Sequence, residues 1–289
     1  MLIFRTIFGL IPIRFLRWPF VRIVDMVFAR LCLLVLGYAY LSPSYVDLRR
    51  LRLVAASNRE YKTYRFGRGI ERGSLVVCNS SSFVQVLFLV YYFSPTFVDV
   101  VPGSDDVFPL GLWGALARTY GASPSGSKRA VPLNVFLESN RADGPVVLFP
   151  EGRARTNNLG LLRFEPVFGR DDGVRDGRAD ALIARLHLVA FRFPNKGSYS
   201  AAQPVDGMLS VVVRLCMEIV PAIMGASSMS ASYAPDLVAA EGGTGRDALS
   251  PSKKLQVVRD LLAKAAGMKT VDLDARDYER FVKFYHEKR

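Results

Sequence analysis

The chain has 289 residues, enough to bury one sizeable α/β core, and 38 basic against 26 acidic residues give it a net charge of +12. Half of its residues are hydrophobic and its mean hydropathy is +0.19, which favours contact with a membrane and with anionic lipid headgroups. Its three scattered cysteines give neither a disulfide framework nor a metal cluster, and no zinc-finger, basic heptad or ribonucleoprotein pattern supports nucleic-acid binding.

The first 46 residues are predicted to anchor the protein on a membrane. Residues 1–41 are rich in Leu, Ile, Phe and Val, but arginines recur through them, which is not the pattern of a cleavable signal peptide. The longest uncharged part, Leu31 to Val46, has 16 residues, fewer than the roughly 20 that a helix needs to span a bilayer. We therefore expect a monotopic or hairpin anchor with a bend near Pro12, in which the arginines reach the headgroups. The alternative is a helical cap that packs on the protein's own core.

Strands and helices are predicted to alternate through the middle of the chain. Leu75 to Cys78 is short and β-branched enough for a buried strand. A helix from about Ser82 to Tyr92 should end at Ser94-Pro95, because the residue before proline avoids the α region. Further expected elements are a strand at 96–101, a helix at 108–120, a loop at 121–127, a helix at 133–138, a strand at 146–149, and apolar segments at 186–193 and 211–220 that fit either state.

The C-terminal part is predicted to hold a surface loop and two helices. Gly225 to Ser250 is rich in Ser, Ala and Gly, so we expect a mobile loop. Ser250-Pro251 starts a helix to about Ala266, and Asp274 opens an amphipathic helix to about Lys288. The predicted fold class is α/β, a mixed or mostly parallel sheet flanked by helices, with an N-terminal membrane-anchoring helical segment. The predicted divisions are an anchor at 1–46, an α/β domain at 47–224, a flexible loop at 225–250 and C-terminal helices at 251–289 that pack on the same domain.

A glycine turn flanked by arginines follows the predicted strand at 146–149. Pro150 ends the hydrogen-bond ladder of that strand, and Gly152 permits a positive φ or a close approach of the backbone to a ligand. Arg153 and Arg155 stand beside the turn, where two guanidinium groups can hold a phosphate through paired hydrogen bonds. We therefore predict an anion site at this turn. The alternative is a solvated turn held by salt bridges.

Three blocks of the sequence resemble the PlsC-like glycerolipid acyltransferases. Phe149-Pro150-Glu151-Gly152 resembles the start of their F-P-E-G-[TS]-R block, and residues 156–164 resemble the T-N-G-R-x-L-L-x-F tail of the lysophospholipid branch. Residues 79–87 align with the N-H-x-S-x-x-D-x-x block, and residues 108–113 with Gly121 resemble the P-x-x-G-W…G stretch. The resemblance covers roughly Leu75 to Val220, about half of the chain.

The resemblance implies an enzyme at the cytosolic face of the endoplasmic reticulum or of lipid droplets. Such enzymes move a fatty acyl group from acyl-CoA, the co-substrate, to a lysophospholipid hydroxyl. The fungal type converts lysophosphatidic acid to phosphatidic acid in phospholipid and triacylglycerol synthesis. The expected partners are membrane lipids, lysophospholipid and acyl-CoA, with no nucleic acid, no metal and no bound cofactor. The substrate-binding residues implied in this chain are Asn79, Phe149, Pro150, Glu151, Gly152, Arg153, Arg155 and Asn157, among which Glu151 is expected to shape the turn.

The family's catalytic pair is replaced in this chain. In the family a histidine is the general base and an aspartate five residues later holds its ring, whereas this chain has Ser80 and Gln85 there. A serine hydroxyl is too weak a base at neutral pH, and glutamine carries no charge that would stabilise an imidazolium. Three possibilities follow. His187 is a substitute base, or Ser80 only orients the acceptor in a slow reaction, or the fold binds lipid or acyl-CoA without turnover, as an adaptor in lipid or membrane trafficking.

Overall fold

An eight-stranded sheet forms the centre of the protein. The computed structural model describes residues 14–39, 41, 43–44, 46–47, 63–119, 130–141, 144–152, 160–168, 182–193, 208–217, 224–230 and 250–288. The sheet has the order β1-β11-β10-β4-β8-β5-β6-β7. Its strands are β1 (Pro43–Ser44), β4 (Leu75–Cys78), β5 (Thr96–Val100), β6 (Asp106–Leu110), β7 (Val131–Pro132), β8 (Val146–Leu148), β10 (Leu186–Arg192) and β11 (Gly225–Ser230). The four central strands, β10, β4, β8 and β5, are parallel, and antiparallel pairs flank them.

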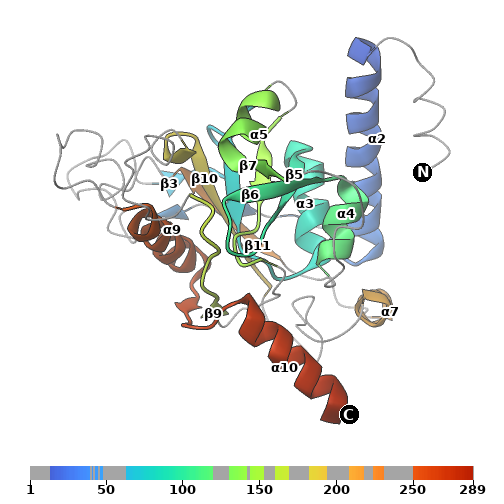
Figure 1. Ribbon diagram of the computed structural model, residues 1–289. Coiled ribbons are helices and arrows are strands. Elements are labelled where there is room, and N and C mark those ends of the chain that lie inside the picture. Colours follow the sequence, from blue (N-terminus) through green and yellow to red (C-terminus); the bar gives the residue numbers. More distant parts are fainter. Residues whose placement is uncertain are drawn as a thin grey trace.

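Helices cover both faces of this sheet (Figure 1). One face carries α2 (Arg14–Val35), α3 (Phe83–Phe93) and α4 (Leu112–Arg118), and the other carries α5 (Leu133–Ser139) and α9 (Pro251–Ala266). Because successive strand side chains point to opposite faces, Leu75 and Val77 join the core under α5 and α9, whereas Val76 joins the core under α3. The predicted α/β class, with a mostly parallel mixed sheet flanked by helices, is confirmed.

Most of the predicted elements are present. The strand at 75–78 and the helices at 83–93, 133–139, 251–266 and 275–288 lie where the sequence places them. Ser82 caps α3, since its hydroxyl accepts a hydrogen bond from the N–H of Val84. Ser250 caps α9 in the same way, with Pro251 in the first turn. The two ambiguous apolar segments form strand β10 and helix α7 (Met208–Met217).

Two predicted elements are wrong. The helix predicted at 108–120 begins only at Leu112, because residues 106–110 pair with β5 as strand β6. The loop predicted at 225–250 begins with strand β11, in which Ala226 and Met229 are buried and the Ser228 hydroxyl accepts the N–H of Gly67. In both places, pairing within the sheet overrides the local composition. The predicted loop at 121–127 and residues 231–249 lie outside the described residues.

Helix α2 lies within the region that was predicted to anchor the protein. Ala29 and Leu33 are fully buried, so one side of the helix packs on the core beside α3. The other side exposes five large apolar side chains by 43 to 71%, those of Ile23, Val27, Leu31, Leu34 and Val35. Within the described residues, no helix is both long enough and apolar enough to cross a bilayer. The predicted bend at Pro12 lies outside that part of the chain.

Two short strand pairs and one projecting helix complete the described structure. β2 (Val46–Asp47) pairs with β3 (Thr63–Tyr64), and β9 (Gly160–Leu161) pairs with β12 (Lys269–Thr270). β12 leads into α10 (Ala275–Lys288). The two C-terminal helices were expected to pack on the α/β domain, and α9 does so against β10. By contrast, α10 has no buried residue and extends away from the sheet (Figure 1).

Candidate functional site

The loops that follow β4 and β8 meet at one edge of the sheet. β4 and β8 are parallel neighbours, with Val77 paired to Leu148, so the residues after each strand emerge side by side. In open α/β sheets, ligands bind in the crevice outside the carboxyl ends of the strands. We call residues 79–82, 149–152 and 160–165, together with Arg118, the carboxyl edge. It contains the start of the block at 79–87 and the described parts of the block at 149–164, and it is the candidate site.

Glu151 ties the two loops together. Its Oε2 accepts the backbone N–H of Ser80 at 2.7 Å, and its Oε1 accepts the backbone N–H of Leu162 at 3.0 Å. The side chain is fully buried, where a carboxylate is stable only if hydrogen bonds replace its lost hydration. The expectation that Glu151 shapes the turn agrees with these contacts. Gly152 follows with φ of 65°, the left-handed conformation that glycine adopts most easily.

Asn79 and Gln85 support the loop after β4. The Asn79 side chain pairs with the backbone of Phe191 on β10, since its Oδ1 accepts the N–H at 2.8 Å and its Nδ2 donates to the carbonyl at 3.0 Å. Gln85 Nε2 donates to the Asn79 carbonyl at 2.9 Å, and Gln85 Oε1 accepts the N–H of Ser81 at 3.2 Å. An uncharged amide therefore closes the loop by donating one hydrogen bond and accepting another, which a carboxylate cannot do.

The structure brings four of the predicted site residues into one buried cluster. Asn79, Ser80, Gln85 and Glu151 are each at most 1% exposed. The contact from Ser80 to Glu151 uses the backbone N–H of Ser80. Phe149 and Pro150 are buried beside them. In this part of the site the Gln85 side chain and the backbone N–H of Ser80 take part in hydrogen bonds that hold the loop after β4.

Arg118 is a member of the carboxyl edge that the sequence reasoning missed. This guanidinium group is 2% exposed and donates from Nε to Asp99 Oδ1 at 2.5 Å, and from Nη2 to the carbonyls of Phe149 and Gly152. It also lies over the Phe149 ring, 4.9 Å from its centroid. Arg118 therefore holds the turn after β8 through its backbone carbonyls. The sequence signal for this role is weak, namely that Arg118 is the one charged residue of a short helix that is otherwise apolar.

The predicted phosphate ligands Arg153 and Arg155, and also Asn157, lie outside the described residues. Both ends of their segment are nevertheless held at the carboxyl edge. Gly152 is fixed through its carbonyl by Arg118, and the N–H of Leu162 donates to Glu151. On the far side, the Arg259 guanidinium donates to the Leu162 carbonyl at 2.8 Å.

The structure does not bring His187 to Ser80. His187 is paired with Val76 on the neighbouring strand, four residues before Ser80 and therefore about 13 Å away along the strand direction. It lines a polar cleft of about 220 Å³ at the opposite, amino edge of the sheet, with Arg72, Arg141 and Arg185. Burial lowers the pKa of His187 to about 4, so its ring is neutral at pH 7.

Comparison with known proteins adds no relative. No family model, no curated protein and no solved structure matches the chain. Among the described residues, no three His, Cys, Asp or Glu side chains are grouped so that they would hold a metal ion. The interpretation of the carboxyl edge therefore depends on its own geometry and on the motifs that meet there.

Proposed function

We propose that the protein transfers a fatty acyl group from acyl-CoA to a lysophospholipid, with lysophosphatidic acid as acceptor and phosphatidic acid as product. The observation that carries this proposal is the Glu151 bridge, whose two hydrogen bonds join the loop after β4 to the segment after β8. Two motifs that resemble acyltransferase blocks are thus parts of one edge, where an α/β sheet binds its ligands. The activity belongs to phospholipid and triacylglycerol synthesis.

The reaction at this edge depends on positioning. The acceptor hydroxyl oxygen attacks the thioester carbonyl, the carbon–sulfur bond breaks, and the hydroxyl proton passes by way of water to the leaving thiolate of coenzyme A. Orientation alone can contribute several kcal/mol to such a transfer. Losing the family's histidine costs about 10² to 10⁴ in rate, so we expect slow turnover. In this proposal Arg153 and Arg155 hold the phosphate of lysophosphatidic acid or of coenzyme A.

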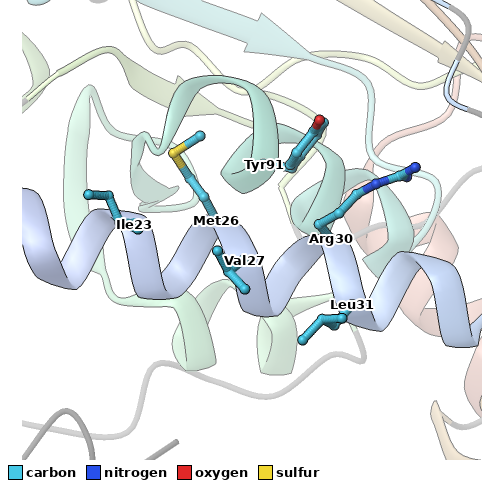
Figure 2. A pocket seen from close by; sticks show the side chains of 6 residues that line it. All are labelled: Ile23, Met26, Val27, Arg30, Leu31 and Tyr91. Atoms are coloured by element: carbon cyan, nitrogen blue, oxygen red, sulfur yellow. The ribbon is translucent and has the colours of Figure 1, made fainter.

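We propose that the site works at the surface of the endoplasmic reticulum or a lipid droplet, facing the cytosol. The uncovered side of α2 supports this location. A hollow of about 260 Å³ is lined there by Ile23, Met26, Val27, Arg30, Leu31 and Tyr91 (Figure 2). Its lining is almost entirely apolar, and its arginine lies 5.6 Å from the Tyr91 ring, a combination typical of side chains at a membrane interface.

Lipid or acyl-CoA binding without turnover, as an adaptor in lipid or membrane trafficking, is the second candidate. One observation favours it, namely that the side chains at the family's catalytic positions are buried and Gln85 is engaged with backbone groups. A site that has lost its base keeps its ability to bind. This candidate predicts unchanged binding and no product.

An acyl-transfer assay separates the two candidates. Purified full-length protein is incubated with labelled oleoyl-CoA and lysophosphatidic acid in mixed micelles, and phosphatidic acid is quantified. We expect product above that of a heat-denatured sample, a decrease of about tenfold for Arg153→Ala, and little change for Arg141→Ala, an exposed arginine at the amino edge. Product no faster than in buffer, with retained liposome binding, selects the adaptor. Equal effects of the two arginine substitutions would refute the phosphate role.

A further inference from the structure

Helix α10 carries large aromatic side chains that are mostly exposed. None of its 14 residues is buried, although its sequence is strongly amphipathic. Isolated helices of this length are marginal in water, and most helices gain their stability by packing an apolar side. α10 therefore needs a surface to lie on.

One side of α10 is aromatic. At 100° per residue, Tyr278, Phe281 and Tyr285 lie within about 60° of one another on one side of the helix, and Phe284 lies about 60° further round, beyond Asp277 and Lys288. Phe281 is 52% exposed and Phe284 is 58% exposed. The opposite side is charged, with Arg276, Glu279, Arg280, Lys283 and Glu287. This division is that of a helix lying in the plane of a membrane interface.

The N-terminal end of α10 is held at the carboxyl edge. The N–H of Arg163 donates to the Leu273 carbonyl at 2.8 Å, and Asp274 caps the first turn by accepting the N–H of Asp277 at 2.9 Å. Ala275 lies so close to Gly152 that a side chain at that glycine would contact it at 3.4 Å. The helix thus starts at the carboxyl edge and carries its aromatic side chains outward from there.

Two observations favour a membrane as the surface that α10 lies on. Helices α2 and α7, which carry large exposed apolar side chains, lie on the right of the view in Figure 1, the side toward which the outer half of α10 extends. In addition, aromatic rings and snorkelling cations are the residues that membrane interfaces select, and the Lys288 ammonium lies 5.8 Å from the Phe284 ring at the outer end of the helix.

We propose that α10 is an interfacial helix that docks the carboxyl edge on a phospholipid membrane, with Phe281, Phe284 and Tyr285 inserted among the lipids. Its four basic and three acidic residues nearly cancel, so insertion of the rings dominates over charge attraction. The inference depends on the helix itself and holds for either function proposed above.

Site-specific tryptophan fluorescence tests this proposal in the full-length chain. Phe281→Trp places a reporter on the aromatic side, and Glu279→Trp is the matched control on the charged side. Each spectrum is corrected by subtracting that of the parent protein, and vesicles of phosphatidylcholine are compared with vesicles that also contain phosphatidic acid. Brominated lipids are then added as quenchers.

We expect the Phe281→Trp emission to shift to the blue and to be quenched on both kinds of vesicle, whereas Glu279→Trp is unaffected. The double variant Phe281→Ser, Phe284→Ser should bind vesicles at least about tenfold more weakly, because each ring loses the apolar burial that it gains in the membrane. The fold should be unchanged, since neither ring is buried in the protein. Equal quenching of the two reporters would overturn the proposal. A blue shift without vesicles that grows with protein concentration would also overturn it, in favour of a second copy of the chain.

Discussion

The polar side chains at the two edges of the central sheet have different surroundings. At the carboxyl edge, Glu151 and Asn79 are fully buried and each holds backbone groups of another segment. At the amino edge, three arginines line a polar cleft around His187, whose Nδ1 is buried and has no hydrogen-bond partner among the described residues. Buried side chains thus hold the loops at the carboxyl edge, whereas the amino edge has a cleft lined by charged side chains.

The structure distinguishes between two residues, Ser80 and His187, that the sequence alone could not tell apart as catalytic candidates. Ser80 and His187 were both candidates for catalysis, and the structure puts them at opposite ends of neighbouring strands. A side chain can act on a substrate only within hydrogen-bond reach. The carboxyl edge is therefore the candidate site, and His187 belongs to the polar cleft at the amino edge.

The largest expected effect comes from Arg118. Arg118→Met keeps much of the side-chain volume but leaves Asp99 without its buried cationic partner, so we expect a loss of about 3–5 kcal/mol in the free energy of unfolding. Urea denaturation measures this loss. The matched change at the other edge, Arg141→Met, alters an exposed side chain and should stay within about 0.5 kcal/mol. Equal losses in the free energy of unfolding for the two variants would show that the two edges do not differ in this way.

Glu151→Gln should cost less, about 2 kcal/mol. The amide oxygen can accept one of the two backbone N–H groups, while the amide NH₂ faces the other donor and leaves it unpaired. The same urea titration measures this change. Because the substitution also loosens the loop after β4, acyl transfer should fall with it. A variant as stable as the parent would show that the bridge does not hold the two loops.

His187 should make stability depend on pH. Burial lowers its pKa in the folded protein to about 4, below the 6.5 of the unfolded chain, so its contribution is complete above pH 6.5 and is lost as the pH falls towards 4. At pH 5 the loss is about 2 kcal/mol relative to pH 7.5. The difference between the parent and His187→Gln, followed by urea unfolding across this range, isolates the effect. Parallel curves would contradict the neutral buried ring.

Ser80→Ala should give the smallest effect. The contact from Ser80 to Glu151 uses the backbone N–H, which alanine keeps, so we expect a stability loss of no more than about 1 kcal/mol. Acyl transfer should fall less than about tenfold, because a hydroxyl does not act as the general base. A loss of a hundredfold or more with unchanged stability would show instead that Ser80 takes part in the chemistry.

The sequence could predict the helices and strands that have local signals. From these elements it could also predict that the two loops carrying the motifs lie close together. The caps at Ser82 and Ser250 and the apolar run at 75–78 specify their elements, and the ends of parallel strands then share an edge. The sequence could not predict the pairing of Asn79 with Phe191, 112 residues away, because only the fold brings them together. Strand β11 was missed because sheet pairing, rather than apolar composition, creates it.

Photoaffinity labelling shows where on the protein a lysophosphatidic acid binds. A lysophosphatidic acid analogue with a diazirine beside its glycerol is photolysed on the full-length protein with acyl-CoA present, and the labelled peptides are identified by mass spectrometry. We predict labels within residues 79–87 and 149–165, at the carboxyl edge. Labels confined to residues 71–74, 184–185 and 187, which line the polar cleft at the amino edge, would contradict this assignment.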